Sequence, residues 1–421
     1  MNETIRKVPR ILLTGRGPVL LAAALLLLAL GSLYAATGSW ERAWRLIGVA
    51  SYHNNFGDLR VITHSIPCAA SGVDPYVKEA CNTYWKQRPQ QDVPYQDILL
   101  NYPPIWLHSG SLGISANSTN AVGVAIGLAA MLSLWRILRP RTTTGGVMTM
   151  AAILSPSVLL GFERGNIDLV IFSMLVCMIV VTQRCAPTLR SSIRAVVIVV
   201  LTVLKFFPVA AVTLLIRSKR SWLAALVTAV LAVVAAWVVA DGKFATVLAN
   251  TPKIDNLAFG SLPLLIGVDK ALGGSGTVSK GMSLAALLLS TLAFLVVFVP
   301  TLARKLARPF PRHVPAIDDD LNGSLATAGL SIFCAAFLFG ASFDYRLIFL
   351  LLTLPLLISA HEDDPAGKRR LLAPVAIIVF LWLSRVTDKV AHADEVLDWA
   401  IFAVGSSWLG SALLLRGKRE R

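Results

Sequence analysis

Polar and ionisable side chains stand out as short clusters in a chain that is otherwise strongly apolar. In chain order the clusters are Asp58 with Arg60 and His64, Asp74 with Pro75 and Tyr76, Tyr102 with Pro103 and Pro104, Glu163 and Arg164 with Asn166 and Asp168, Lys205, and Asp344 with Tyr345 and Arg346. Each lies between or beside apolar runs, where ionisable groups are costly, so each is a candidate for function.

The carboxylates and cations in these clusters can do acid–base chemistry or hold an anion. Asp58 is our candidate for a catalytic carboxylate, although it could also cap a helix or pair with Arg60. Lys205 lies near the centre of its apolar run, where an ammonium group calls for an anionic partner. The guanidinium of Arg346 suits phosphate oxygens and could equally pair with Asp344.

Structural roles are open for the other polar residues. His64 fits a structural role better than a catalytic one, and Asp74 before a proline is typical of a turn. Glu163 can pair with the neighbouring Arg164, and Asp168 can cap the span that follows it.

The composition indicates a chain embedded in a membrane. Hydrophobic residues make up 55% of the 421 residues, charged residues only 15%, and the mean hydropathy is +0.67, whereas a soluble chain needs more charge to cover its surface. The apolar runs are long enough to cross a hydrocarbon core as helices, and the alternation of a β-barrel is absent. The sequence therefore predicts an all-α polytopic membrane protein, one integral membrane domain over residues 1–421, with roughly twelve transmembrane helices including short or broken ones.

The net charge of +15 follows the pattern of a membrane protein rather than that of a nucleic-acid-binding protein. Basic residues gather at the ends of apolar runs, as the positive-inside rule predicts. The basic N-terminus precedes an apolar run at residues 18–36 with no convincing cleavage site, which predicts an uncleaved first span. We expect a multi-pass protein of the cytoplasmic membrane with both termini in the cytoplasm.

Two long polar segments fall on the extracytoplasmic side in this topology. Residues 38–119 form the first extracytoplasmic loop and residues 241–280 the second. The polar clusters described above also lie on that side, so we expect them to form one site there.

The apolar segment between Arg194 and Arg217 has basic residues at both ends. It is long enough to cross once but not twice, and Lys205 and Pro208 interrupt it. Two half-helices that meet near Lys205 would keep every basic loop in the cytoplasm. The alternative is one kinked span.

The cysteines and acids give no strong sign of a disulfide framework or a metal site. Cys68 and Cys81 lie in the first loop and could form a disulfide if that loop is extracytoplasmic, or remain free thiols. The chain has no zinc-type Cys/His spacing, no HExxH motif and no EF-hand loop. The acidic run at residues 318–320 falls on the predicted cytoplasmic side and fits a solvated loop. We expect no cofactor, and the sequence does not support a divalent metal.

The ordered set of clusters resembles the GT-C superfamily of integral membrane glycosyltransferases, and most closely its glycosyltransferase 87 group, which includes polyprenyl-phosphate-mannose-dependent mannosyltransferases. The matching pieces are Asp58 early in the first loop, residues 72–76, residues 102–104, Gly165 and Asn166 opening a span, and the Lys-x-x-Pro segment at residues 205–208. The resemblance covers about residues 15–350.

This resemblance implies sugar transfer from a polyprenyl-phosphate donor to a lipid-linked or glycan acceptor, with inversion at the anomeric carbon. Asp58 would be the general base, and Lys205, Arg346, Arg164 and His64 would bind the donor phosphate. The pocket would be completed by Asp74, Tyr76, Tyr102, Glu163, Asn166, Asp168, Asp344 and Tyr345.

The chain departs from the superfamily at one position. Many members carry a pair of acids in the first loop, whereas here Leu59 and Arg60 follow Asp58. A secondary transporter or lipid flippase with a broken helix at Lys205 is the main alternative, and an O-antigen ligase-like enzyme or a non-catalytic membrane assembly are others. The chain shows no inverted or parallel repeat, which argues against the transporter.

Overall fold

The computed structural model describes residues 12–51, 55–87, 99–218, 221–252, 258–275, 279–298, 315–339, 341–364, 368–383 and 393–416. The basic residues Arg6, Lys7 and Arg10 and the tail beyond residue 416 lie outside these ranges, as do parts of both predicted loops.

Long apolar helices dominate the described chain. Seven of them have the length and composition to cross a membrane. They are α2 (Gly17–Thr37), α6 (Thr119–Ile137) with η2 (Ala116–Ser118) before it, α10 (Pro187–Leu204), α11 (Ser221–Val239), α16 (Leu321–Leu338), η4 (Asp344–Thr353) continued by α17 (Leu354–Glu362), and α19 (Ala393–Arg416).

Other apolar helices are bent or short. The helices α7 (Thr143–Ile153) and α8 (Pro156–Arg164) meet at 47° and pass together as one broken span. The break falls at Pro156, which suits the first position of a helix but not its interior. Three further helices carry shorter apolar stretches: α9 (Ile167–Thr182), α14 (Lys280–Phe298, whose apolar stretch is Gly281–Leu295) and α18 (Leu372–Leu383). The predicted all-α polytopic class, with short and broken helices, is confirmed.

Short elements make up the polar segments between these helices. In the first loop they are α3 (Trp40–Leu46), α4 (Gly57–Ala70), α5 (Lys78–Lys86) and η1 (Pro104–Leu112). Elsewhere they are η3 (Phe207–Leu215), α12 (Phe244–Asn250), β1 (Ala258–Gly260), α13 (Pro263–Ala271), β2 (Ala341–Phe343) and η5 (Lys368–Leu371). The two strands pair antiparallel, with Ala258 opposite Phe343 and Gly260 opposite Ala341.

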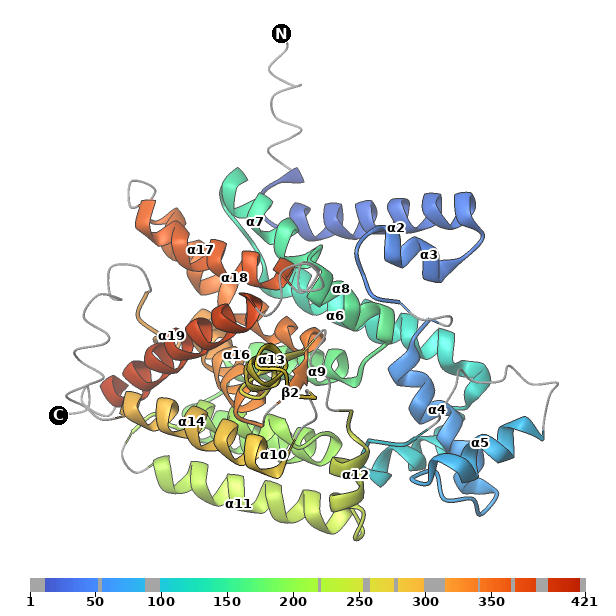
Figure 1. Ribbon diagram of the computed structural model, residues 1–421. Coiled ribbons are helices and arrows are strands. Elements are labelled where there is room, and N and C mark those ends of the chain that lie inside the picture. The colour runs from blue at the N-terminus through green and yellow to red at the C-terminus, as the bar shows by residue number, and fades with distance from the viewer. Residues whose placement is uncertain are drawn as a thin grey trace.

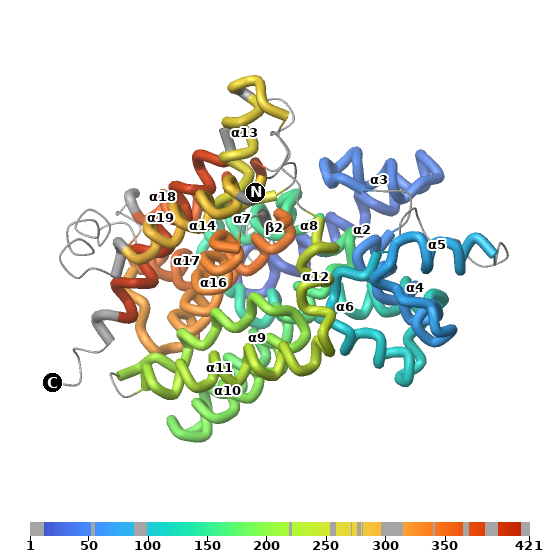
Figure 2. The backbone as a smooth tube through the Cα atoms, turned by 60° about the horizontal axis from the view of Figure 1, so that its bottom comes forward, coloured from blue at the N-terminus to red at the C-terminus, as the bar shows by residue number. Residues whose placement is uncertain are grey.

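The helices separate two ends of the molecule. The loop end comprises the described residues of 38–118, 163–168, 205–206, 240–263 and 341–346, and its helices α3, α4 and α5 gather at the right of Figure 1. The basic end comprises the described residues of 12–16, 136–143, 182–190, 216–221, 315–322 and 360–371. Figure 2 shows α12 on the side of the molecule that carries α4 and α5, and Asn250 at the end of α12 donates to the carbonyls of Tyr76 and Leu100. The second loop therefore meets the first at the loop end.

The chain reverses direction at Lys205, as the topology argument predicts. Lys205 is extended at the end of α10, and η3 then runs back beside that helix. As a result Arg194 Nη1 lies 3.4 Å from the carbonyl oxygen of Leu214, at the basic end of both arms. The predicted reversal at Lys205 is therefore confirmed, and the single kinked span is wrong. The two arms of this hairpin are not both half-helices, because α10 has 18 residues, the length of a full span, whereas η3 has 9.

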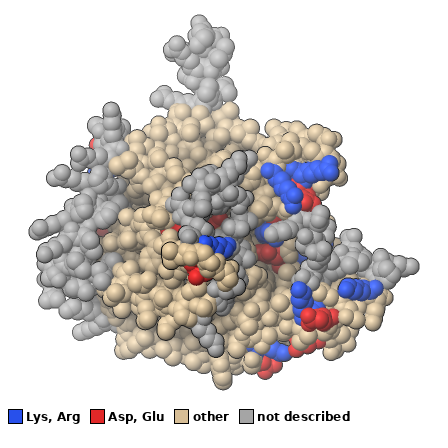
Figure 3. Space-filling view, in the orientation of Figure 1, with Lys and Arg blue, Asp and Glu red and all other residues tan. Residues whose placement is uncertain are grey.

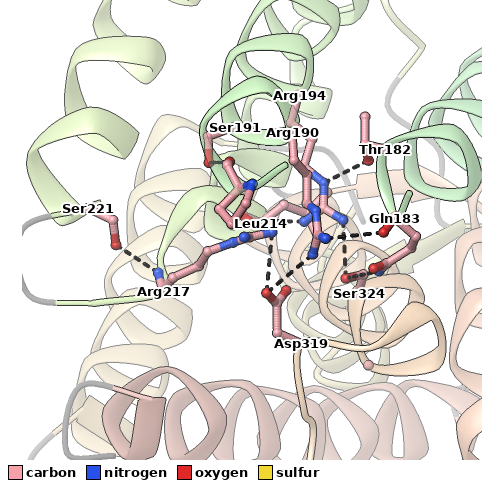
Figure 4. Close-up of polar contacts among 12 residues, drawn as sticks. Thr182, Gln183, Arg190, Ser191, Arg194, Leu214, Arg217, Ser221, Asp319 and Ser324 are labelled. Carbon is pink, nitrogen blue, oxygen red and sulfur yellow. Dashed lines mark hydrogen bonds and ion pairs between the residues drawn. The ribbon is translucent and has the colours of Figure 1, made fainter. Parts of the chain in front are cut away.

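Charged contacts at the basic end hold the two arms of this hairpin together (Figure 4). One oxygen of Asp319 lies 3.7 Å from Arg190 on α10 and 3.3 Å from Arg217 after η3. Arg194 is fully buried and donates to Thr182 Oγ1 at 3.1 Å and to Ser324 Oγ at 3.3 Å. The acidic run at residues 318–320 is therefore not only a solvated loop, because Asp319 connects the start of α16 to both arms of the hairpin.

A small lobe of the first loop is joined by a disulfide between α4 and α5. The sulfur atoms of Cys68 and Cys81 are 2.00 Å apart, so the structure selects the disulfide over two free thiols. Trp85 packs beside this bond and donates its indole N–H to the carbonyl of His64 at 3.2 Å. We call α4, α5 and the chain between them the disulfide lobe.

The interior is built around α16, and the outer helices face away from it. Within the candidate spans, 78% of the α16 window is buried, against 22% for α11. Gly329 permits close packing on η4, because a Cβ there would lie 2.5 Å from the carbonyl oxygen of Phe349. Figure 3 shows one face of the molecule on which charged side chains gather at the right, next to a wide uncharged surface. Such a surface suits contact with lipid.

We predict that the disulfide stabilises the loop end. Replacing both Cys68 and Cys81 with serine frees the chain between these two positions, which are 13 apart in the sequence, at an expected cost of about 3 kcal/mol. The measurement is thermal unfolding of the purified protein in detergent, with wild type in reducing agent as the matched comparison. Free thiols at both positions, found by alkylation and mass spectrometry of the unreduced protein, would contradict this prediction.

Candidate active site

A tight turn between α8 and α9 presents polar side chains at the loop end. Gly165 ends α8 in the left-handed region at φ 57°, where a side chain would be strained and would also meet Phe56. Asn166 then caps α9, since its Oδ1 accepts a hydrogen bond of 2.8 Å from the backbone N–H of Asp168. The alternative in which Asp168 caps this span is therefore wrong: Asn166 is the cap, and the Asp168 side chain in the first turn is left for other contacts.

Asp168 binds two cations that come from distant segments of the chain. Its Oδ1 lies 2.5 Å from Lys205 Nζ at the tip of the hairpin, and its Oδ2 lies 3.3 Å from Arg346 Nε on η4. The three side chains are 1%, 12% and 15% exposed, so the pairing is shielded from water. We call these residues, with Asn166 and Asp58, the Asp168 cluster.

Aromatic rings surround the two cations. Lys205 Nζ lies 5.2 Å from the ring centre of Tyr102 and 5.8 Å from those of Phe207 and Tyr345. The guanidinium of Arg346 lies 5.0 Å from the ring centre of Phe207. At these distances the ring faces attract positive charge, which helps to keep both cations charged in a dry setting.

Asp58 enters the cluster from the first turn of α4, through Asn166. Its Oδ2 accepts a hydrogen bond from the Asn166 side-chain amide, and Asn166 Oδ1 lies 3.3 Å from Lys205 Nζ. A carboxylate in the first turn is also favoured by the helix dipole. Asp58 is partly exposed whereas Asp168 is buried, so of these two carboxylates Asp58 is the one that a substrate can reach.

Tyr102 forms one wall of the cluster, and Tyr76 supports it from behind. The Tyr102 hydroxyl lies 3.3 Å from the Asn166 amide nitrogen, and the Tyr76 hydroxyl donates to the Tyr102 carbonyl at 2.9 Å. Burial, followed by the negative charges of Asp58 and Asp168, raises the pKa of Tyr102 well above its usual value. Tyr102 therefore stays protonated and can donate a hydrogen bond in the site.

Glu163 and Arg164 connect the turn to the first loop. Their side chains pair at 3.2 Å, as one of the two readings of the sequence predicts. Ser51 Oγ donates to Glu163 Oε1 at 2.7 Å, and the backbone N–H of Phe56 donates to the Glu163 carbonyl at 2.7 Å. Arg164 also lies against Gly57, so it is next to the helix turn that carries Asp58.

The structure does not bring every predicted site residue to the Asp168 cluster. His64 is fully buried in the disulfide lobe, with its ring centre 5.1 Å from that of Trp85 and its Nδ1 3.1 Å from the carbonyl of Arg60. This position fits the structural alternative and not a role in binding phosphate. Asp344 and Tyr345 are both buried at the start of η4. Tyr345 stacks on Phe343 with ring centres 5.3 Å apart, and it does reach the cluster, because its ring also lies beside Lys205.

Asp74 links the two long loops instead of lining the cluster. Its carboxylate lies 2.7 Å from Lys243 Nζ before α12 and accepts a hydrogen bond of 2.9 Å from the backbone N–H of Tyr76. Burial raises the pKa of Asp74, but the hydrogen bonds from Lys243 and Tyr76 and the charge of Lys243 outweigh it, so the pKa is lowered overall. The turn predicted for this segment is consistent with the contact to Tyr76.

Several residues of the site were not singled out from the sequence. Trp106 donates its indole N–H to the carbonyl of Leu204 at 2.9 Å and so ties the first loop to the hairpin just before Lys205. Ser342 accepts a hydrogen bond of 2.8 Å from Arg346, and Asn250 donates to the carbonyls of Tyr76 and Leu100 at 3.1 Å. Trp106 lies two residues after the Pro103–Pro104 pair, and this nearby motif is the one signal that could have identified it.

Metal binding finds no ready geometry in the part of the chain that the structure describes. There, no group of three or more His, Cys, Asp or Glu side chains could hold a metal ion. Both oxygens of Asp168 already face cations. The arrangement therefore offers one accessible carboxylate, two shielded cations and a protonated phenol around the turn at Asn166.

Comparison with known proteins gives a family for this region. Residues 98–314 match the model of glycosyltransferase family 87. The matched part includes Tyr102, Asn166, Asp168 and Lys205, while Asp58 and Arg346 lie on either side of it. No curated protein and no solved structure matches the chain.

We predict that Asp168→Asn destabilises the fold by about 3 kcal/mol, because it leaves two shielded cations without their shared carboxylate. The measurement is thermal unfolding in detergent. The matched control is Asp168→Asn combined with Lys205→Met, which removes one stranded charge and is expected to recover part of the loss. Equal stability of wild type and Asp168→Asn would contradict the pairing.

The link between the loops is expected to be weak. Asp74 and Lys243 are 42% and 39% exposed, so a double-mutant cycle with Asp74→Asn and Lys243→Gln is expected to give a coupling below about 1 kcal/mol. Because the Asp74 pKa is lowered on folding, this contribution is present above the unfolded pKa and is lost as the pH falls through the folded one. A coupling that persists once Asp74 is protonated would contradict this assignment.

Proposed function

Because the chain belongs to glycosyltransferase family 87 and is a membrane glycosyltransferase, we propose that it takes its sugar from a polyprenyl-phosphate-linked donor at the Asp168 cluster. The observation that carries this proposal is the convergence of Lys205 and Arg346 on one site beside the accessible carboxylate of Asp58. The acceptor is a hydroxyl of a glycolipid or glycan.

Lys205 and Arg346 are the proposed ligands of the donor phosphate. They come from the hairpin tip and from η4, and they share the carboxylate of Asp168. Two cations that meet on one carboxylate are spaced for the oxygens of one phosphate group. Charge that develops on the leaving phosphate is stabilised strongly by cations fixed in a dry site. Arg164, next to the start of α4, is the third candidate.

Asp58 is the proposed general base. In the transfer, an acceptor hydroxyl forms a bond to the anomeric carbon while the bond from that carbon to the phosphate oxygen breaks. The proton of the hydroxyl passes to the Asp58 carboxylate, and the polyprenyl phosphate leaves with the bonding electron pair. Attack opposite the leaving group inverts the anomeric centre. Because polyprenyl phosphate is a good leaving group, no strong acid is required.

Asp168 and Asn166 serve to position the reacting groups in this proposal. Asp168 neutralises Lys205 and Arg346 until the donor arrives, which lowers the cost of keeping two cations shielded from water. Asn166 contacts Asp58, Lys205 and the Tyr102 hydroxyl. It therefore fixes the position of the proposed base, Asp58, relative to the proposed phosphate-binding cation, Lys205. The two long loops, joined by Asn250 and by the Asp74–Lys243 pair, are suited to cover the sugar.

The extracytoplasmic side of the cytoplasmic membrane is the proposed location of the site. Arginines concentrate at the basic end, which the positive-inside rule assigns to the cytoplasm, together with both termini. The Cys68–Cys81 disulfide lies at the loop end and requires an oxidising compartment, which supports the same orientation independently. Mannose, glucose and arabinose donors all fit this chemistry, and only the resemblance favours mannose.

The test is transfer in vitro from a panel of polyprenyl-phosphate sugars, with mass spectrometry of the products. Asp58→Asn is expected to lower kcat by about 10²- to 10⁴-fold, the usual worth of a general base. Lys205→Ala is expected to lower kcat/KM by at least about tenfold through lost contact with the donor phosphate.

The matched control is Glu79→Gln, which removes an exposed acid from α5 in the same loop. It is expected to transfer sugar at the wild-type rate. If Asp58→Asn behaves like Glu79→Gln while the protein level is unchanged, Asp58 is not the base.

A further inference from the structure

A cavity lies at the basic end, where α6 ends, α17 ends, and α7 and α16 begin. Its volume is about 160 Å³, roughly ten times what one water molecule requires. It is lined by Arg136, Ile137, Leu138, Arg139, Pro140, Arg141, Thr149, Leu321, Asn322, Pro355, Ile358, Ser359 and Glu362. We call it the basic cavity. Because α6 and α16 run from this end to the loop end, it is separate from the Asp168 cluster.

The charges around the basic cavity do not cancel. Glu362 and Asp363 are taken up by Arg141, with N–O distances of 3.2 and 2.6 Å. Among the residues that the structure describes, no carboxylate forms an ion pair with Arg136 or Arg139. A third guanidinium, that of Arg16, lies nearby and stacks 3.8 Å from the centre of the Trp135 ring.

The electrostatic setting of Arg139 reflects this surplus of positive charge. Partial burial, followed by the charges of Arg16 and Arg136, lowers the pKa of Arg139. Guanidiniums that repel one another in this way are stabilised when an anion binds between them. The surplus therefore favours a negatively charged ligand in the cavity.

A buried hydroxyl group in the cavity wall also lacks a partner. Thr149 on α7 is fully buried, and its Oγ1 has no hydrogen-bond partner in the described chain. Leaving a buried hydroxyl unpaired costs about 1–3 kcal/mol, so a ligand that accepts its hydrogen bond is favoured. The hydroxyl is thus placed to donate to an oxygen atom inside the cavity.

The first turn of α16 adds backbone donors to the cavity lining. Asp320 caps this helix by accepting from the N–H of Gly323 at 2.7 Å, and Leu321 and Asn322 line the cavity before it. The first N–H groups of a helix have no partner within the helix, and the helix dipole favours an anion there. Guanidiniums, a hydroxyl and helix N–H groups are together the donor set that phosphate oxygens prefer.

We propose that the basic cavity binds a phosphate group. Its place at the ends of four helices, next to the N-terminal end of α2, is where the headgroups of a bilayer lie, and basic pockets at such a position are suited to anionic phospholipids. The same donors would hold a free phosphate from the aqueous side. The experiment therefore separates these two sources.

The experiment uses the full-length protein purified in detergent and measures binding rather than sugar transfer. Retention of phosphatidylglycerol is counted by native mass spectrometry, with phosphatidylcholine as the uncharged comparison, and inorganic phosphate is titrated separately. The variants are Arg136→Gln and Arg139→Gln, and the matched control is Arg184→Gln, an exposed arginine at the same end that does not line the cavity.

The expected result is binding of at least one probe by wild type, weakened about tenfold in Arg136→Gln and in Arg139→Gln and unchanged in Arg184→Gln. Preference for phosphatidylglycerol identifies a lipid headgroup, and binding of inorganic phosphate without it identifies a free phosphate. The proposal is overturned if wild type binds neither probe, or if Arg184→Gln loses binding as much as the cavity variants.

Thr149→Val keeps the experiment decisive if an arginine variant does not fold. Valine has the shape of threonine without the hydroxyl, so the cavity wall is preserved while one donor is removed. Binding of the preferred probe is expected to weaken severalfold. Wild-type binding by Thr149→Val would overturn the proposal, whatever the activity of the enzyme toward sugars.

Discussion

The shielded pairing of Asp168 with Lys205 and Arg346 is the interaction on which the architecture of the site depends. One carboxylate at the start of α9 neutralises a cation from the hairpin tip and another from η4, more than a hundred residues further along the chain. None of the three could stay charged away from water without the others. The hairpin, the turn at Gly165 and the close approach of η4 to α16 all serve to bring these groups together.

Much of the fold was predictable because membrane crossing imposes simple rules. The span at residues 18–36 follows directly from apolar length, and the structure has it as α2. The reversal at Lys205 follows from charge and length together, because both flanks are basic and the run between them is too short to cross twice. The contacts of Asp319 with Arg190 and Arg217 show why those flanks stay together.

The detailed geometry of the site was less accessible from the sequence. The sequence predicts that one site contains Asn166, Asp168, Lys205 and Arg346. It does not predict that the carboxylate of Asp168 pairs with both cations. His64 lies near Asp58 in the sequence, yet it is buried in the disulfide lobe. Asp74 lies near Tyr76, yet it pairs with Lys243 of the second loop. Contacts such as Trp106 with Leu204 depend on how the first loop packs against the hairpin, which apolar periodicity does not determine.

The most direct test of the central claim is a structure of the protein with a polyprenyl-phosphate sugar bound. The donor phosphate is expected within hydrogen-bond distance, about 3 Å, of both Lys205 and Arg346, with the anomeric carbon on the side of Asp58. Phosphate density at any other place, with Lys205 and Arg346 still paired to Asp168, would contradict the assignment of the active site.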